Sequence, residues 1–366
     1  MRICVDLTSL ADNFSGIERF ALSITKELIK NEKYHWILLF KNTVHKAFED
    51  ANAEKIVIKG SNKLLFNQII LPLKMLKIKA DRYFFPAFPA PFFFFNTNVF
   101  NTIHDLSCWD CPRSNKKYMI AYFRLMYWKA SICNKKIVTV SEFSKKRICS
   151  ILSVKPENIA VVYNGISRHF NAENIDEIKK KQIADKYSLP PSFILSLSTI
   201  EPRKNVRLLL DACAELLEEG VVEDIVLAGR KGWKMNDFLS GYQEKFLKHV
   251  FFTGFVDDED LPSVYKRAKL FACPSQYEGF GSPPLEAMAC GTRVISSDAA
   301  SMPEILGDAA VYFKNQNLND LKRILKKEIK VVEKNSDYVK CGEQQAKKYS
   351  WNREAKKLIN FLCECQ

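Results

Sequence analysis

The sequence predicts an α/β protein with two doubly wound parallel-sheet domains that face a cleft. The chain has 366 residues, which is too long for one hydrophobic core of ordinary size and suits two domains. Short apolar segments alternate with segments of helical periodicity, a pattern typical of parallel sheets covered by helices on both faces. The pattern restarts around a charged stretch at residues 174–186. We therefore expect a first domain over residues 1–168 and a second over residues 169–349.

Residues 1–168 contain the first run of alternating elements. The apolar spacing of residues 17–29 predicts a helix, and Ser141 is a favourable N-cap for a later one. The apolar residues 92–95 are surrounded by prolines, which exclude a helix, so we expect a strand end and a loop there. The expected strands are residues 2–6, 36–40, 83–85, 99–103 and 136–140.

Residues 169–349 repeat the alternation, and each expected strand has a helical segment beside it. Ligands of such sheets bind outside the carboxyl ends of the strands, so residues that directly follow a strand are the candidates for a site. The expected strands are residues 193–197, 224–228, 249–252, 269–273, 294–296 and 310–313.

The composition is basic, with 55 Lys and Arg against 42 Asp and Glu and a net charge of +13. Such a charge attracts polyanions or anionic membrane surfaces. No zinc finger and no helix rich in Arg and polar residues is recognisable, so we expect no nucleic-acid partner. No apolar run reaches the length of a membrane span, so any membrane contact would be peripheral.

The cysteines indicate a reducing compartment. The chain has eleven of them, an odd number, in a sequence without a recognisable secretory leader, which argues against a disulfide framework and for a cytoplasmic location. Cys108 and Cys111 have the spacing of a redox or metal pair, and Cys363 and Cys365 could in principle add two ligands. Their spacings do not match, so we expect no metal ion and no cofactor.

Residues 115–129 contain an aromatic and basic stripe that has two interpretations. Tyr118, Tyr122, Met126 and Lys129 lie near one helical face, with further lysines beside it. The helix could lie on the inner face of an anionic membrane. It could instead be an inward-facing core helix, which is the commoner use of an aromatic stripe.

A glycine-rich turn between two carboxylates is the most informative motif. Glu278 precedes the turn 279–281, and Glu286 lies about two turns inside the helix that follows. The first N–H groups of a helix lack intrahelical partners and, with the helix dipole, favour an anion. We expect Glu278 in a loop open to the cleft rather than in the core, with one carboxylate holding sugar hydroxyls and the other a ribose.

Arg203 and Lys204 follow the first expected strand of the second domain and precede a helix. A guanidinium fork and an ammonium point charge together suit a diphosphate. Cations at a helix start oppose the helix dipole and need a compensating anion. We therefore expect both side chains to point at a bound diphosphate.

Three further positions lie at strand ends. His104 follows the strand at 99–103, Gly16 ends the loop 12–16 that follows the first strand, and Gly254 and Phe255 follow the strand at 249–252. A glycine at a helix start allows a ligand to approach the backbone closely. Each of these signals is weak by itself, because ordinary turns and core histidines use the same residues.

The string from Tyr277 to Ile295, which contains Glu-Gly-Phe-Gly and a downstream Ala-Cys-Gly-Thr, resembles the signature of the retaining glycosyltransferases of family 4. These enzymes have the GT-B fold of two Rossmann-like domains, and the match extends over nearly the whole chain. It is most similar to the bacterial mannosyltransferase-like branch that builds O-antigen and capsule polysaccharide. The resemblance implies that a terminal helix at about residues 350–366 packs back onto the first domain.

The same resemblance assigns roles to the motifs. It implies catalytic contacts of Glu278 and His104 with the donor sugar. Many members carry an arginine directly after the strand, near Ser198, where this chain has none, so Arg203 would take over more of that role. The implied donor-binding residues are Gly16, Arg203, Lys204, Gly254, Phe255, Gly279, Phe280, Gly281, Ser282, Leu285 and Glu286.

The predicted function is transfer of a hexose from a nucleoside diphosphate sugar, with GDP-mannose favoured, to a hydroxyl of a glycan or lipid-linked glycan. Retention would ordinarily require a carboxylate nucleophile, and the chain offers no evident one. The resemblance implies instead that the departing diphosphate itself accepts the acceptor proton. The alternatives are a UDP-hexose donor, a nucleotide-sugar-binding subunit without turnover, and charge-driven binding of nucleic acid.

Overall fold

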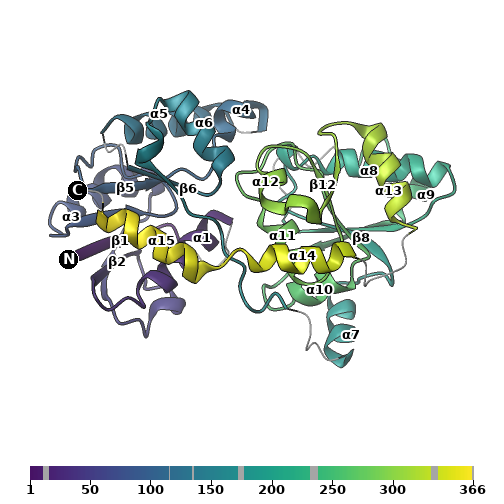
Figure 1. The fold of residues 1–366 in the computed structure, drawn as a ribbon, viewed down its shortest axis with the longest axis horizontal. Helices are drawn as coiled ribbons and strands as arrows, with labels where there is room; N and C mark the ends of the chain where they lie inside the picture. The colour runs from purple at the N-terminus through teal and green to yellow at the C-terminus, as the bar shows by residue number, and fades with distance from the viewer. Residues whose placement is uncertain are drawn as a thin grey trace. The chain divides into compact units, whose positions relative to one another are not determined.

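A computed structural model describes residues 1–10, 16–114, 116–133, 136–171, 177–230, 238–330 and 337–364. The chain divides into two compact units, one formed by Met1–Gly165 with Ser350–Gln366 and the other by Ile166–Tyr349. Each unit is a parallel sheet covered by helices (Figure 1). The predicted class, two doubly wound parallel-sheet domains, is confirmed. The division after Gly165 lies close to the boundary expected after residue 168.

The first unit contains a seven-stranded sheet of order β3-β2-β1-β4-β5-β6-β7, in which every described pair is parallel. All five expected strands are present, and β3 and β7 were missed because one is a half-buried edge strand and the other has three residues. The strands are β1 (Arg2–Asp6), β2 (His35–Lys41), β3 (Glu54–Ile58), β4 (Arg82–Phe85), β5 (Val99–Thr102), β6 (Lys136–Thr139) and β7 (Ile159–Val161).

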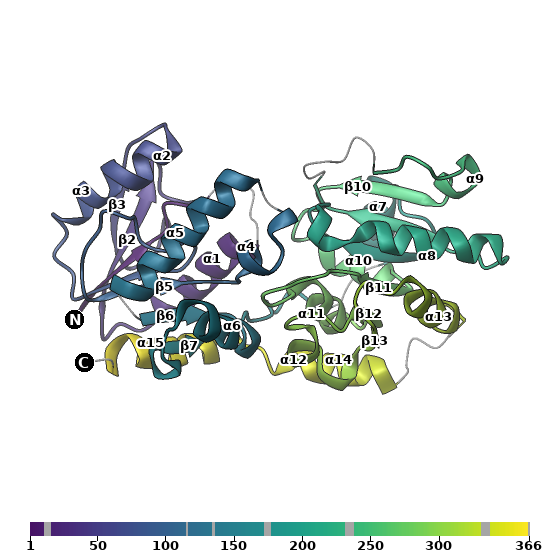
Figure 2. The ribbon, with the colours of Figure 1, turned by 90° about the horizontal axis from the view of Figure 1, so that it is seen from above.

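The helices of the first unit cover both faces of this sheet (Figure 2). The strand order runs one way from β1 to β3 and the other way from β4 to β7, so right-handed crossovers place α1 on one face and α2, α3, α5 and α6 on the other. The helices are α1 (Gly16–Leu28), η1 (Lys46–Phe48), α2 (Lys63–Leu65), the π-helix η2 (Phe66–Ile70), α3 (Leu71–Met75), α4 (Ser107–Asp110), η3 (Pro112–Ser114), α5 (Lys117–Cys133), α6 (Glu142–Leu152), η4 (Pro156–Asn158) and α15 (Trp351–Glu364). The expected N-cap is present, since the Ser141 side chain accepts a hydrogen bond from the Ser144 N–H.

The terminal helix α15 belongs to the first unit and packs on α1, where the rings of Phe20 and Trp351 lie 5.8 Å apart. The fully buried Glu354 accepts a hydrogen bond of 3.1 Å from the Tyr163 N–H. A Cβ atom on Gly165 would lie 2.3 Å from the Trp351 nitrogen, so only glycine permits this close approach.

Helix α5 corrects the expectation about the aromatic stripe at residues 115–129. Met126 and Lys129 are buried, as the core interpretation predicts, whereas Tyr118 is exposed. The Lys129 Nζ donates to the carbonyl oxygens of Phe94 (2.8 Å), in the loop expected at 92–95, and of Pro91 (3.2 Å), which directly precedes it. The stripe is therefore not a continuous membrane-facing surface, and Lys129 is not a surface charge.

The second unit contains a six-stranded parallel sheet of order β10-β9-β8-β11-β12-β13. All six expected strands are present. They are β8 (Phe193–Leu197), β9 (Asp224–Ala228), β10 (Val250–Gly254), β11 (Leu270–Cys273), β12 (Val294–Ser297) and β13 (Val311–Phe313).

Helices cover both faces of the second sheet as well. Leu209 of α8 and Leu325 of α13 share one hydrophobic cluster with Leu270 and Ala272 of β11. Phe271 lies between these two strand residues and points to the opposite face, where its ring contacts Tyr265 of α10. The helices are α7 (Glu177–Lys186), η6 (Pro202–Lys204), α8 (Val206–Glu218), α9 (Glu244–Leu247), α10 (Leu261–Arg267), α11 (Ser282–Ala289), α12 (Met302–Leu306), η7 (Gly307–Ala309), α13 (Leu318–Glu328) and α14 (Asp337–Lys347).

None of the helices in the described ranges is long and apolar enough to cross a membrane. The ten cysteines among these residues are free thiols. Burial raises the pKa of Cys108 to about 12, so this thiol stays protonated near neutral pH. Cys365, which could have added a ligand to the pair Cys108 and Cys111, lies outside the described residues.

Candidate functional site

The two main motifs meet at the carboxyl edge of the second sheet. Strands β8 and β11 are neighbours, and the chain leaves β8 toward β9 on one side and β11 toward β12 on the other. Such a topological switch point is where open parallel sheets bind ligands. The segment after β8 carries Arg203 and Lys204 in η6, and the segment after β11 carries Glu278.

Glu278 lies between the two cations in one charge cluster. Its carboxylate accepts hydrogen bonds from Lys204 Nζ (2.6 Å), Arg203 Nη1 (3.2 Å) and the Ser275 hydroxyl (2.6 Å). The other end of the Arg203 guanidinium pairs with Glu201 at 2.9 Å. Two cations and two carboxylates therefore balance within the cluster Glu201, Arg203, Lys204 and Glu278, which we call the charge cluster.

Burial makes this pairing strong. Glu278 is only 8% exposed, so the expectation that it lies in an open loop is wrong. Burial alone would raise the pKa of its carboxyl group, but the charges of Lys204 and Arg203 and the hydrogen bonds from Lys204 and Ser275 lower the pKa to about 2. Glu278 is therefore ionised throughout the physiological pH range, and it is a structural partner of both cations.

The anion expected next to Arg203 and Lys204 is present within the chain. We expected a diphosphate, and the structure shows the carboxylates of Glu278 and Glu201 in contact with these cations. An ammonium group has three N–H donors, so Lys204 can contact a phosphate oxygen while it keeps Glu278. The prediction of a diphosphate site at these residues stays a prediction.

The glycine-rich turn is held by core contacts. Gly281 has φ +86°, and a Cβ atom there would lie 2.2 Å from Met302 Cε. The Ser301 hydroxyl donates to the carbonyl oxygens of Glu278 (2.9 Å) and Phe280 (3.3 Å). The turn is thus fixed by side chains from the β12–α12 connection, which fixes the backbone that carries Glu278.

The start of α11 differs from the anion-binding helix terminus that we expected. Pro283 and Pro284 occupy its first turn, and proline has no backbone N–H. Leu285 is fully buried, and Phe280 is buried with its ring 5.6 Å from that of Tyr349. The side chains of these two predicted donor-binding residues are core elements, so only their backbone atoms could contact a ligand.

Glu286 of α11 is buried and contacts a tyrosine. It is 4% exposed, and its carboxylate accepts a hydrogen bond of 2.9 Å from the Tyr265 hydroxyl of α10. Two other predicted donor-binding residues lie near the turn. Ser282 is the first residue of α11, and Gly279 directly follows Glu278. Glu278 thus contacts two cations, and Glu286 accepts a hydrogen bond from a phenol.

Phe255 offers an exposed aromatic face at the ends of β9 and β10. It is 44% exposed, and the Arg230 guanidinium lies 5.1 Å from the centre of its ring. Gly254, which precedes it, has φ +69° and an exposed backbone. An aromatic ring with an arginine beside it suits the flat face of a nucleotide base.

The remaining predicted site residues lie in the first unit. His104 follows β5, and its Nε2 donates a hydrogen bond of 2.9 Å to the Pro86 carbonyl oxygen. Burial lowers the pKa of His104 to about 4, so the ring is neutral near pH 7 and its Nδ1 is an acceptor. Gly16 is the first residue of α1, whereas the loop 12–15 that we expected beside it lies outside the described residues.

Glu201, Ser275 and Ser301 were missed from the sequence. Glu201 had a local signal, because an acid two residues before Arg203 can reach the same guanidinium. Ser275 and Ser301 had none, since they become neighbours of Glu278 only when the segments after β11 and β12 fold together.

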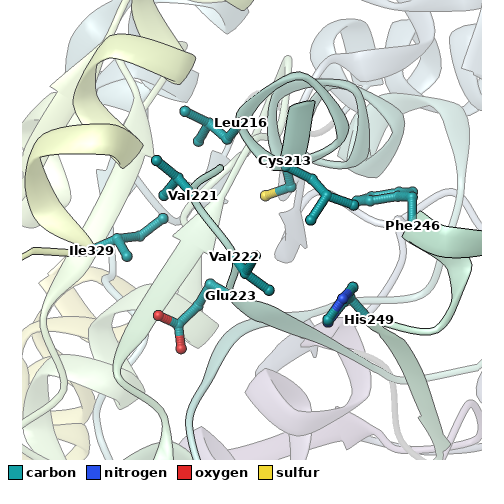
Figure 3. Close-up of a pocket in the computed structure, with 9 residues that line it drawn as sticks. Cys213, Leu216, Val221, Val222, Glu223, Phe246, His249 and Ile329 are labelled. Atoms are coloured by element: carbon teal, nitrogen blue, oxygen red, sulfur yellow. The ribbon is translucent and has the colours of Figure 1, made fainter. Parts of the chain in front are cut away.

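No group of three or more His, Cys, Asp and Glu among the described residues could hold a metal ion. Figure 3 shows a small pocket of the second unit, lined by residues that include Val222, Glu223, Phe246 and His249. These residues precede β9 and β10, so the pocket lies at the amino edge of the sheet, opposite the charge cluster. Its volume of ≈ 10 Å³ has room for about one water molecule, which excludes a nucleotide.

Two doubly wound parallel-sheet units in tandem are the architecture of the GT-B fold. The comparisons with known proteins agree. Anabaena Alr3699/HepE in complex with UDP and glucose has a TM-score of 0.74 at 16% identity, with 100% of both chains covered. WaaG, a glycosyltransferase involved in lipopolysaccharide biosynthesis, has a TM-score of 0.74 at 15% identity, with 99% of both chains covered. At such identities the likeness shows the fold alone.

The sequence comparisons show the family. Residues 176–348 match the family Glycosyl transferases group 1. O-antigen chain mannosyltransferase B of Escherichia coli is 31% identical over 269 residues, which cover 71% of this chain and 68% of that protein. Serotype-specific mannosyltransferase WbdA of Escherichia coli is 33% identical over 223 residues, which cover 60% of this chain but only 26% of WbdA. The chain belongs to the glycosyl transferases group 1 family, and it is a glycosyltransferase.

Proposed function

We propose that the chain transfers mannose from a nucleoside diphosphate mannose, with GDP-mannose as the first donor to test, to a hydroxyl of a growing surface polysaccharide. The observation that carries this proposal is the buried charge cluster at the switch point of the second sheet. The names of the relatives, O-antigen chain and serotype-specific mannosyltransferases, support the sugar and the product class.

The chemistry follows from the charges. Arg203 and Lys204 bind the donor diphosphate, and Glu278 orients both cations and meets the sugar hydroxyls. When the bond between the anomeric carbon and the phosphate oxygen breaks, negative charge grows on the diphosphate, and the two cations stabilise it. The acceptor oxygen bonds to the anomeric carbon on the same face, and its proton passes to the departing phosphate oxygen, which retains the configuration without a protein nucleophile.

The other predicted contacts complete the donor site as part of this proposal. Tyr265 fixes the Glu286 carboxylate, which accepts hydrogen bonds from the ribose hydroxyls. The base packs near Gly254 and Phe255. His104 and Gly16 of the first unit stay predicted contacts of the sugar and of a phosphate or the acceptor.

The acceptor in this proposal is a lipid-linked glycan, so that the enzyme works in the cytoplasm at the inner face of the membrane. The exposed Tyr118, Leu125 and Trp128 of α5 support a peripheral contact, although the buried Lys129 and Met126 take no part in it. The net charge of +13 favours an anionic membrane.

The test uses purified protein and a panel of donors. GDP, UDP and ADP are compared by thermal shift, because a ligand that binds only the folded state raises its midpoint. GDP-mannose and UDP-glucose are then incubated with a mannose-terminated acceptor, and the anomeric configuration of the product is read by NMR. Transfer from GDP-mannose with retention is the expected result. Preference for a UDP sugar would replace the proposal by a UDP-hexose-dependent transferase, and binding of a donor without cleavage would replace it by a nucleotide-sugar-binding subunit.

A further inference from the structure

We propose that residues 64–79 of the first unit, with the loop 92–95 beside them, form a docking surface for an anionic lipid bilayer. This proposal rests on the proposed function, because a lipid-linked acceptor requires the enzyme to work at a membrane. It extends the contact beyond the helix that the sequence had suggested, α5, to the helical segment and the loop beside it.

Exposed apolar side chains concentrate in this region. Of the eighteen large hydrophobic side chains that are exposed among the described residues, eleven lie on residues 64–76, on the loop 92–95 or on α5. Phe93 and Phe95 of the loop are 63% and 64% exposed. The helical segment from α2 to Leu76, the C-cap of α3, contributes further exposed side chains. Leu64, Leu65, Ile69, Leu73 and Leu76 have exposed fractions from 48% to 67%.

The segment is apolar on both sides. Phe66, Leu71 and Met75 are buried and pack on the sheet in one hydrophobic cluster with Ile37 and Tyr83. A surface helix of a globular protein ordinarily shows polar residues on its outward side. An apolar outward side of this extent marks an interaction surface.

The charges select an anionic bilayer as the occupant. From Lys55 to Ala80 the sequence contains six lysines and no Asp or Glu. Lys74, Lys77 and Lys79 are exposed next to the apolar side chains. Apolar side chains enter the headgroup and acyl boundary while neighbouring lysines bind lipid phosphates, which is how interfacial helices combine the two forces.

Hydrogen bonds join the helical segment, the loop and α5 into one surface. The side chain of Gln68 in η2 donates to the Tyr122 hydroxyl of α5 (3.0 Å) and accepts from the Phe92 N–H (2.9 Å). The buried Lys129 of α5 donates hydrogen bonds to the Pro91 and Phe94 carbonyl oxygens and so ties the loop to this helix. Figure 2 shows α2, α3 and α5 as neighbours in this unit. The exposed residues are thus held as a fixed surface.

Co-sedimentation of the full chain with vesicles tests the proposal. Vesicles of phosphatidylcholine alone are compared with vesicles that also contain phosphatidylglycerol, at low and high salt. The wild-type protein should bind the anionic vesicles, and salt should weaken the binding. Lys74→Gln with Lys77→Gln and Lys79→Gln should weaken it about a hundredfold, since each lysine near an anionic surface contributes about fivefold. Leu73→Gln with Leu76→Gln should weaken it on the order of tenfold or more.

Matched controls separate the surface from general effects. Ile178→Gln with Val222→Gln changes two exposed apolar residues of the second unit and should leave vesicle binding unchanged. All variants should keep the wild-type thermal midpoint, because the altered side chains are exposed. Absence of wild-type binding, or equal binding by the leucine variant and the control, would overturn the proposal. A leucine variant that changes only the oligomeric state in light scattering would also overturn it, by assigning the surface to a second copy of the chain.

Hydrolysis of the soluble donor, measured in parallel, distinguishes this proposal from the proposed function. The lysine and leucine variants should cleave donor at the wild-type rate. Donor cleavage without vesicle binding would remove only the docking surface. Vesicle binding without cleavage or transfer from any donor would remove only the proposed reaction.

Discussion

Replacing Glu278 by Gln removes the charge that holds Arg203 and Lys204 together. The carboxyl pKa is about 2 in the folded chain, against an ordinary value of 4.5 for a glutamate. This difference corresponds to about 3 kcal/mol of stability at neutral pH. The size agrees with the roughly 3–5 kcal/mol lost when one partner of a buried ion pair is removed.

The pH dependence of this loss follows from the sign of the pKa change. Because the folded-state pKa is lowered, the stabilisation is fully present above the unfolded value of 4.5 and is lost as the pH falls through about 2. Wild type and Glu278→Gln should therefore differ by about 3 kcal/mol at pH 7 and by only about 1 kcal/mol at pH 3.

Urea unfolding at both pH values measures the difference directly. Glu259→Gln, which changes an exposed acid of the same unit, should stay within about 0.5 kcal/mol of wild type. On the folded fraction, Glu278→Gln should also lower sugar transfer roughly a hundredfold to a thousandfold. A stability difference that is absent, or that does not shrink with acid, would refute the assignment of Glu278 as the buried anion of the cluster.

Three further predictions concern the same unit. Lys204→Ala should weaken binding of a nucleoside diphosphate more than that of the nucleoside in calorimetry, and its effect should not add to that of Arg203→Ala, because both cations contact one anion. Equal losses for both ligands would exclude a diphosphate contact. Phe255→Ala should weaken nucleoside and nucleoside diphosphate equally, by about 1–3 kcal/mol for a lost stacking contact, and an unchanged nucleoside affinity would place the base elsewhere. Gly281→Ala should lower the thermal midpoint, because the new Cβ would lie 2.2 Å from Met302 Cε at φ +86°. In a chain that already carries Met302→Ala, Gly281→Ala should lower the midpoint less, because only the backbone strain at φ +86° remains, and no further loss there would show that strain is not involved.

Much of the fold was predictable because the strands are short apolar runs of strong periodicity. All eleven expected strands exist in the structure. The two missed strands, β3 and β7, had no comparable signal, since β3 carries lysine and glutamate among its apolar residues and β7 has only three residues. Strand existence is a local property, whereas pairing at a sheet edge depends on the neighbouring strand.

The candidate site was predictable in position but not in its electrostatics. The sequence by itself determined that Arg203, Lys204 and Glu278 follow strands, and parallel strands place such residues at one edge of a sheet. Only the tertiary structure decided that Glu278 is buried and paired with both cations, because β8 and β11 are adjacent although 74 residues separate Lys204 from Glu278. The same holds for Lys129, which reads as a surface charge in the sequence and is buried in the structure. Burial and ion pairing depend on contacts between distant segments, and a local pattern carries no information about those contacts.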